Sequence, residues 1–141
     1  MNLKFSIITP AHKNTPYHKE LYDSIVAQTY KNWEWILWLN NDIKRDLLPK
    51  EFEDDDRVII YETDNTSKNV GYHKHHAFHK GTGDVLVEVD SDDLIDHKCL
   101  QLLNDAYQDP DVGFAYSDAA IWDDDFVPVS YTHLRAHETE T

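Results

Sequence analysis

Residues 81–93 read GTGDVLVEVDSDD, in which a run of valine and leucine lies between two glycines and a group of acidic residues. The run at residues 84–89 predicts a buried β-strand. The glycines end a helix that the sequence predicts from Gly71 to about Lys80. The strand leads straight into Asp90-Ser91-Asp92-Asp93, so its carboxyl end carries a cluster of carboxylates.

The same alternation of strand and helix continues on both sides of this stretch. Residues 33–39 (WEWILWL) are apolar on both faces, which predicts an interior strand whose tryptophans belong to the core. A helix is expected to begin at Thr15 and Pro16, with Thr15 capping the first free N–H groups, and to run to about Gln28. The other predicted elements are strands at residues 3–8, 57–61 and 112–116 and a helix capped by Asp96. This order implies an α/β fold with a doubly wound, mostly parallel sheet.

The chain has 141 residues, which suits one domain, and its formal net charge is −14. This charge argues against nucleic acid as a partner, because binding a phosphate backbone needs a concentrated surface of lysine and arginine. The single cysteine, Cys99, excludes an internal disulfide, and residues 1–13 lack the pattern of a signal peptide, so we expect a cytoplasmic location. No apolar run approaches the ~20 residues that span a bilayer, although peripheral contact with a membrane stays open.

Residues 129–141, VSYTHLRAHETET, have no apolar period and no turn signal. Back-translated, Val129 to Thr139 resembles the constant sequence of a transposase-based sequencing adapter read in one frame. We therefore expect native sequence at residues 1–128 and an artefactual or disordered tail after it. The alternative is an ordinary polar C-terminus.

Three polar clusters follow predicted strands, namely Thr9-Pro10, Asn40-Asn41-Asp42 and Asp90-Ser91-Asp92-Asp93. Ligands bind outside the carboxyl ends of the strands in an open α/β sheet, so the clusters should share one rim. If the chain stays extended past the fourth strand, Asp90 and Asp92 lie on the same side and Asp93 does not. Paired carboxylates suit Mg²⁺ or Mn²⁺, which commonly bridge substrate phosphates. Taken alone, the same pattern is that of a solvated acidic turn.

Three ordered blocks resemble the N-terminal half of family 2 glycosyltransferases of the GT-A fold, namely SIITPAHK from Ser6, SIVAQTYKNWEWILWLN from Ser24 and NVGYHKHHAFHKGTGDVLVEVDSDD from Asn69. The matching features are the opening strand, a Q-T-Y-x-N-W-E segment and a G-D-h-h-h-x-h-D-x-D-D block. The resemblance covers residues 3–118. It implies a truncated, Rossmann-like nucleotide-binding layer and the transfer of a sugar, hexosyl in type, from a nucleotide donor.

The resemblance also implies roles for individual residues. Asp92 matches the acid that binds the divalent metal, Mn²⁺ or Mg²⁺, on the donor diphosphate, and Asp90 matches the acid that faces its ribose and sugar. Thr9, Pro10 and Ala11 match the loop that touches the nucleoside. The implied partners are a nucleoside diphosphate sugar, with a UDP-sugar favoured by family frequency, and an unknown saccharide, lipid or protein acceptor.

Two positions depart from the family pattern. Asn40 stands where the family has an acid that holds the nucleobase, and an amide offers both a donor and an acceptor to a base edge. Lys74 lies in Lys74-His75-His76, where many members have Ala-Arg-Asn, and it is our candidate for a diphosphate contact as a compact cation. A solvated helix lysine is the equal alternative.

The implied reaction is a metal-dependent, inverting glycosyl transfer, in which a carboxylate base deprotonates the acceptor hydroxyl. The family's base lies well beyond the D-x-D, so we expect no catalytic base in this chain and no transfer by the chain alone. Two other functions stay open, a nucleotide-binding remnant without catalysis and a metal-dependent phosphohydrolase of the haloacid-dehalogenase type. The second is disfavoured because that fold places its D-x-D after the first strand.

Overall fold

The computed structural model describes residues 2–40, 43–64, 69–117 and 134–138. The chain divides after residue 100 into two compact units, and the first holds most of the regular structure. None of the helices in the described ranges is long and apolar enough to cross a membrane.

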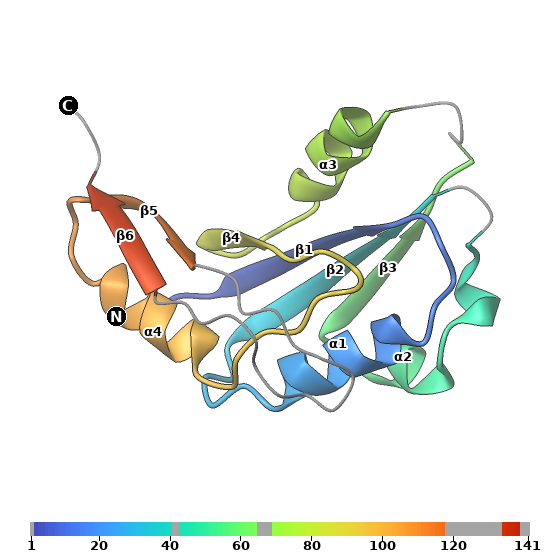
Figure 1. The fold of residues 1–141 in the computed structure, drawn as a ribbon, viewed down its shortest axis with the longest axis horizontal. Coiled ribbons are helices and arrows are strands. Elements are labelled where there is room, and N and C mark those ends of the chain that lie inside the picture. Colours follow the sequence, from blue (N-terminus) through green and yellow to red (C-terminus); the bar gives the residue numbers. More distant parts are fainter. Residues whose placement is uncertain (1, 41–42, 65–68, 118–133, 139–141) are drawn as a thin grey trace, which may run out of the picture. The chain divides into compact units, whose positions relative to one another are not determined.

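The first unit is built on four parallel strands, which Figure 1 shows side by side. They are β1 (Phe5–Ala11), β2 (Trp33–Leu39), β3 (Val58–Glu62) and β4 (Val85–Glu88). Their order across the sheet is β3-β2-β1-β4. Strands β2 and β3 therefore lie on one side of β1, and β4 lies on the other side. The predicted α/β fold with a parallel sheet is confirmed.

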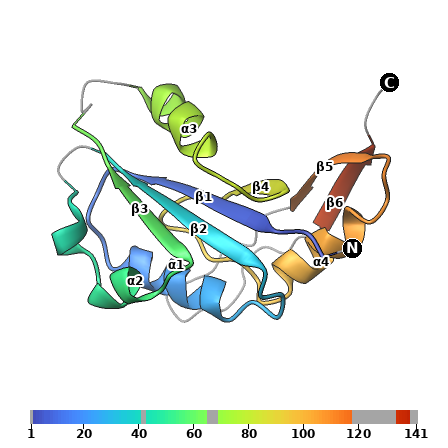
Figure 2. The ribbon, with the colours of Figure 1, turned by 180° about the vertical axis from the view of Figure 1, so that it is seen from behind.

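Helices cover both faces of this sheet, with α1 and α2 on one face and α3 on the other (Figures 1 and 2). The bounds are α1 (Tyr17–Val26), the short 3-10 helix η1 (Arg45–Leu47), α2 (Lys50–Asp54), α3 (Val70–Phe78) and α4 (Cys99–Ala106), which runs across the division between the units. Successive residues of β2 point to opposite faces, and so both helical layers pack on this strand.

The tryptophans of β2 lie in the core, as predicted. Trp33, Trp35 and Trp38 are 3%, 0% and 8% exposed, which leaves no open ring face for a sugar. Trp35 packs against Tyr22 of α1 and Phe52 of α2, at ring-centroid distances of 6.1 Å and 5.3 Å. Trp38 points to the opposite face and packs in a cluster with Ala77 of α3.

Two predicted elements of the first unit differ from the structure. Helix α1 begins at Tyr17 with Pro16 as its cap residue, and the buried Thr15 Oγ1 accepts no hydrogen bond from any residue in the described ranges. The predicted capping by Thr15 is therefore wrong. Thr15 lies one residue before the cap position, too far from the free N–H groups of the first turn to accept a hydrogen bond from them. Strand β4 is not buried on both faces but is the last strand at its edge of the described sheet, and Leu86 is 47% exposed.

The second unit contains β5 (Val112–Ser117) and β6 (Leu134–Glu138), which form an antiparallel pair. The strand predicted at residues 112–116 therefore exists but is not part of the parallel sheet. We expected no regular element in residues 129–141, yet residues 134–138 form a strand. Pairing of this kind is carried by backbone N–H and C=O groups and needs no particular side-chain pattern. The origin of residues 129–141 stays a prediction.

His18 of α1 is an unusual core residue, since its side chain is 1% exposed and both ring nitrogens lack a hydrogen-bond partner among the described residues. Burial lowers the pKa of this imidazole below 6.5. Below about pH 6.5 the unfolded chain therefore takes up a proton that the folded His18 does not, and the free energy of unfolding falls as the pH falls.

We expect His18→Leu to raise the free energy of unfolding by about 1–2 kcal/mol, because an unsatisfied buried polar group is replaced by an apolar one. The substitution should also reduce the loss of stability between about pH 6.5 and pH 5. Urea unfolding at several pH values measures both effects. The exposed His12→Leu is the matched control, and an equal response of the two variants would contradict the prediction.

Candidate functional site

The candidate site lies at the carboxyl ends of β1, β2 and β4. In the order β3-β2-β1-β4, the strands β2 and β3 lie on one side of β1 and β4 lies on the other. The boundary between β1 and β4 is therefore the topological switch point of the sheet, where the strand order reverses. In open α/β sheets, ligands bind in the crevice outside such a point. The strand register pairs Ile8 with Glu88, and the Val89 N–H donates to the Ile8 carbonyl at 3.1 Å. Asp90 therefore follows at the level of Pro10.

The resemblance implied that Thr9, Pro10 and Ala11 form a loop. In the structure they are instead the last three residues of β1. The Thr9 side chain is fully buried, and its hydroxyl accepts a hydrogen bond of 2.9 Å from the Trp35 indole. Thr9 thus connects the rim to the core and does not present its hydroxyl to a ligand. Residues 12–14, which follow, are exposed, and none of them was among the site residues predicted from the sequence.

Asn40 lies beside the end of β1, because its N–H donates to the Ala11 carbonyl at 2.9 Å. The residue is 6% exposed, and its side-chain Oδ1 is buried without a hydrogen-bond donor among the described residues. A buried amide oxygen without a donor is costly, and a ligand N–H is one way to satisfy it. Residues 41 and 42, the other members of this predicted cluster, lie outside the described ranges.

The acidic residues after β4 form a turn, in which the Asp93 N–H donates to the Asp90 carbonyl at 3.1 Å. The extended geometry that would separate Asp93 from its neighbours is therefore absent. Burial raises the pKa of the Asp93 carboxyl, and the negative charges of Asp90 and Asp92 raise it further. All three carboxylates thus act on one small region, and Asp90, Asp92 and Asp93 are all exposed.

Lys74 of α3 is not a free solvated lysine, because its ammonium group forms an ion pair of 2.5 Å with Glu88, the last residue of β4. The hydrogen bond to Glu88 is the main cause that raises the pKa of Lys74; burial opposes it, and the charges of Glu88 and Asp90 raise the pKa further. Lys74 therefore lies within the electrostatic reach of Asp90. Glu88 was not singled out from the sequence, although strand alternation places it on the same side as Asp90.

The donor set at the turn fits a divalent ion that a substrate completes. Mg²⁺ and Mn²⁺ prefer oxygen ligands and commonly take one or two carboxylates together with water and phosphate oxygens. Asp90 and Asp92 supply exposed carboxylates, and their negative charges add to the larger effect of partial burial in raising the pKa of the neighbouring Asp93 carboxyl. Within the described ranges, no three His, Cys, Asp or Glu side chains converge on a metal position by themselves.

A comparison with known sequences finds a family match over most of the chain. The family described as glycosyl transferase family 2 matches residues 6–138. The chain is 26% identical over 109 residues to the glucosyl-dolichyl phosphate glucuronosyltransferase of Haloferax volcanii, a match that covers 75% of this chain and 34% of the relative. The chain thus spans about a third of the length of this relative.

Solved structures share the fold at low sequence identity. S. aureus TarS 1–349 in complex with UDP-GlcNAc matches with a TM-score of 0.67 and 21% identity, over 74% of this chain and 31% of that one. The mannosyltransferase PcManGT from Pyrobaculum calidifontis, in complex with GDP-Man and Mn²⁺, matches with a TM-score of 0.66 and 19% identity, over 87% of this chain and 36% of that one. Both have the α/β arrangement described above.

Proposed function

The chain belongs to glycosyl transferase family 2, and on that premise we propose that it binds the nucleoside diphosphate sugar in a metal-dependent, inverting glycosyl transfer. The observation that carries the proposal is the acidic turn after β4, which lies at the topological switch point of the sheet and within reach of Lys74. A diphosphate needs positive charge, and this is the part of the rim where a cation and a lysine can both supply it. Similar proteins solved with UDP-GlcNAc or GDP-Man support the ligand class.

The nucleobase belongs at Asn40 in this proposal. The buried Oδ1 of Asn40 has no donor among the described residues, and the imide N–H of uracil is a suitable one. The carbonyl groups at the end of β1 lie next to Asn40 and can contact the nucleoside without any contribution from the Thr9 hydroxyl. We propose UDP as the nucleotide, although an amide oxygen would also accept a hydrogen bond from the N–H groups of guanine.

The diphosphate belongs between Lys74 and the acidic turn. Asp90 faces the ribose and sugar, and Asp92 holds the divalent ion. When bound, that ion neutralises charge on the departing nucleoside diphosphate. Lys74 is oriented toward this region by Glu88, so an incoming phosphate has to compete with Glu88 for the ammonium group. Lys74 therefore contributes a second, exchangeable positive charge.

We expect Asp92→Asn to abolish the gain in UDP affinity that Mn²⁺ produces, because the neutral amide is a far weaker ligand for a hard cation. Calorimetric titration of UDP with and without Mn²⁺ measures the gain. The exposed Asp54→Asn, at the end of α2, is the control for a change of one charge and should leave the gain intact.

Asp93→Asn distinguishes between neighbouring ligands of the ion. Asp93 lies beside both Asp90 and Asp92, so we expect a partial loss of the Mn²⁺-dependent gain. Equal losses in Asp92→Asn and Asp93→Asn would contradict the assignment of the ion to Asp92 in preference to Asp93. A wild-type protein whose affinity for UDP does not depend on Mn²⁺ would contradict the metal-dependent function itself.

A second candidate function is nucleotide binding without sugar transfer. It is favoured by the composition of the described rim, in which Asn40, Lys74 and the acidic turn serve the nucleotide and no residue is assigned as a base for an acceptor hydroxyl. Binding with Mn²⁺ but no turnover in any donor assay would support this function.

A further inference from the structure

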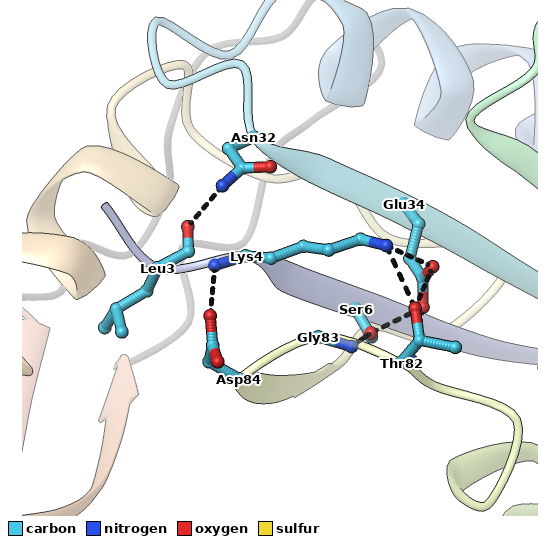
Figure 3. A network of polar contacts seen from close by, with 8 residues as sticks. All are labelled: Leu3, Lys4, Ser6, Asn32, Glu34, Thr82, Gly83 and Asp84. Carbon is cyan, nitrogen blue, oxygen red and sulfur yellow. Dashed lines mark hydrogen bonds and ion pairs between the residues drawn. The ribbon is translucent and has the colours of Figure 1, made fainter. Parts of the chain in front are cut away.

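Glu34 is a buried acid in an otherwise apolar strand, and the proposed function does not use it. It is the second residue of β2, and only 6% of its side chain is exposed. It lies near the amino ends of the strands, whereas the candidate nucleotide site lies at their carboxyl ends. Figure 3 shows that its carboxylate points to β1 and to the segment that leads into β4.

The Glu34 carboxylate accepts hydrogen bonds from two separate parts of the chain. The Ser6 hydroxyl of β1 donates to it at 2.7 Å. The backbone N–H and the hydroxyl of Thr82 both donate to it, each at 2.7 Å. Lys4 forms an ion pair with it at 3.0 Å. One side chain of β2 therefore joins the start of β1 to the residues that precede β4.

Burial acts to raise the pKa of the Glu34 carboxyl, but the hydrogen bonds from Thr82, Ser6 and Lys4 outweigh this effect and lower the pKa from 4.5 to about 2. The side chain is therefore ionised at all ordinary pH values. An ionised acceptor makes each of these hydrogen bonds stronger than a neutral one would be.

Backbone contacts beside Glu34 complete the attachment (Figure 3). The Gly83 N–H donates to the Ser6 hydroxyl at 2.7 Å, and the Lys4 N–H donates to the Asp84 carboxylate at 2.8 Å. A Cβ atom at Gly83 would lie 2.6 Å from the Lys4 carbonyl and 2.9 Å from the Ser6 nitrogen. Only glycine allows so close an approach of the two backbones at this point.

The side chains of β4 do not by themselves define its register against β1. Val85, Val87 and Val89 alternate with exposed residues, so a slip of one residue would reverse the two faces. A slip of two residues would replace one valine by another and keep the pattern. Because a parallel strand rises about 3.3 Å per residue, that slip would move the acidic turn by about 7 Å along β1.

We propose that Glu34 is a positioning residue, whose contacts with Ser6 and Thr82 set the register of β4 and thereby place Asp90 and Asp92 at the ligand rim. The connection is direct, because the Phe5–Val85 pairing that starts the β1–β4 ladder follows immediately after these contacts. The part of this proposal that concerns metal and nucleotide rests on the proposed function. The part that concerns β4 does not.

The test uses two separate variants, Glu34→Ala and Gly83→Ala. The second disturbs the same attachment from the side of the segment that leads into β4. Hydrogen exchange should show the backbone amides of residues 85–89 losing at least about tenfold more protection than those of β2 in both variants. The Mn²⁺-dependent gain in UDP affinity should fall by about 10–100-fold, the usual effect of losing the support of a metal ligand, while UDP affinity without Mn²⁺ changes little.

Two conservative substitutions are the controls. Gly71→Ala adds the same methyl group at a glycine of α3 where its nearest neighbour is 3.4 Å away. Thr82→Ser keeps both the backbone and the hydroxyl donor to Glu34. Both should behave as the wild type. Equal loss of protection in β2 and β4, or loss of UDP affinity regardless of Mn²⁺, would overturn the proposal and show that Glu34 only stabilises the fold. If wild-type binding does not respond to Mn²⁺, the proposed function fails and the exchange measurement alone decides the role of Glu34.

Discussion

Purified as the 141-residue chain, the protein is expected to bind UDP weakly in the presence of Mn²⁺ and to transfer no sugar to any acceptor. The resemblance places the catalytic base beyond the D-x-D, in the half of the family fold that recognises the acceptor. The chain matches 34% of the length of the glucuronosyltransferase relative and 31% of TarS 1–349. Loss of a general base alone reduces the rate by about 10²–10⁴-fold, and loss of acceptor orientation reduces it further.

A radiolabelled UDP-sugar assay against saccharide, lipid and protein acceptors measures this deficit. UDP binding by calorimetry on the same sample shows whether the donor rim is intact, and near-UV circular dichroism shows whether the sample is folded. Acceptor-dependent turnover by the folded chain would mean that the base lies within it. Absence of both UDP binding and turnover in a folded sample would instead contradict the proposed donor site.

Trp35→Ala is expected to lower the free energy of unfolding by about 3–5 kcal/mol, because it leaves a cavity in the centre of the core. Trp35 is fully buried between Tyr22 and Phe52, and its indole donates to the Thr9 hydroxyl at 2.9 Å. This loss is a large part of the about 5–15 kcal/mol that keeps a typical domain folded. The substitution also removes the partner of Thr9 at the end of β1.

Urea unfolding followed by far-UV circular dichroism measures the loss without depending on tryptophan fluorescence. Trp35→Phe keeps an aromatic ring against Tyr22 and Phe52 and removes the hydrogen bond, so a smaller loss of about 1–2 kcal/mol is expected. Tyr17→Ala, at a ring that is 49% exposed, is the surface control and should change the free energy by no more than about 0.5 kcal/mol. Equal losses in Trp35→Ala and Tyr17→Ala would contradict the assignment of Trp35 to the core.

The main elements of the first unit could be predicted from local patterns. The apolar run WEWILWL predicted an interior strand because only a strand covered on both faces can bury such a run, and β2 is buried throughout. The alternation of strands with helices predicted the parallel sheet, because parallel neighbours need a crossover between them. These predictions succeed because each depends on residues close together in the chain.

The candidate site was only partly predictable. The sequence indicated that Asn40, Asp90 and Lys74 follow or flank strands, and the topology brings the ends of β1, β2 and β4 together. It did not show that Thr9 is held by Trp35 or that Glu88 holds Lys74, and it left open whether the acidic residues stay extended or form a turn. Each of these depends on a partner distant in sequence or on a local bend that alternation alone does not reveal.

The sequence by itself determined the family, the parallel fold and the types of residue at the rim, because hydrophobic periodicity and short motifs are written along the chain. The tertiary structure decided how those residues are held. Glu34 could be recognised from the sequence as an acid inside an apolar strand, but its partners Ser6 and Thr82 lie 28 and 48 residues away. A buried charge is tolerated only where such partners converge, and their convergence is a property of the folded chain alone.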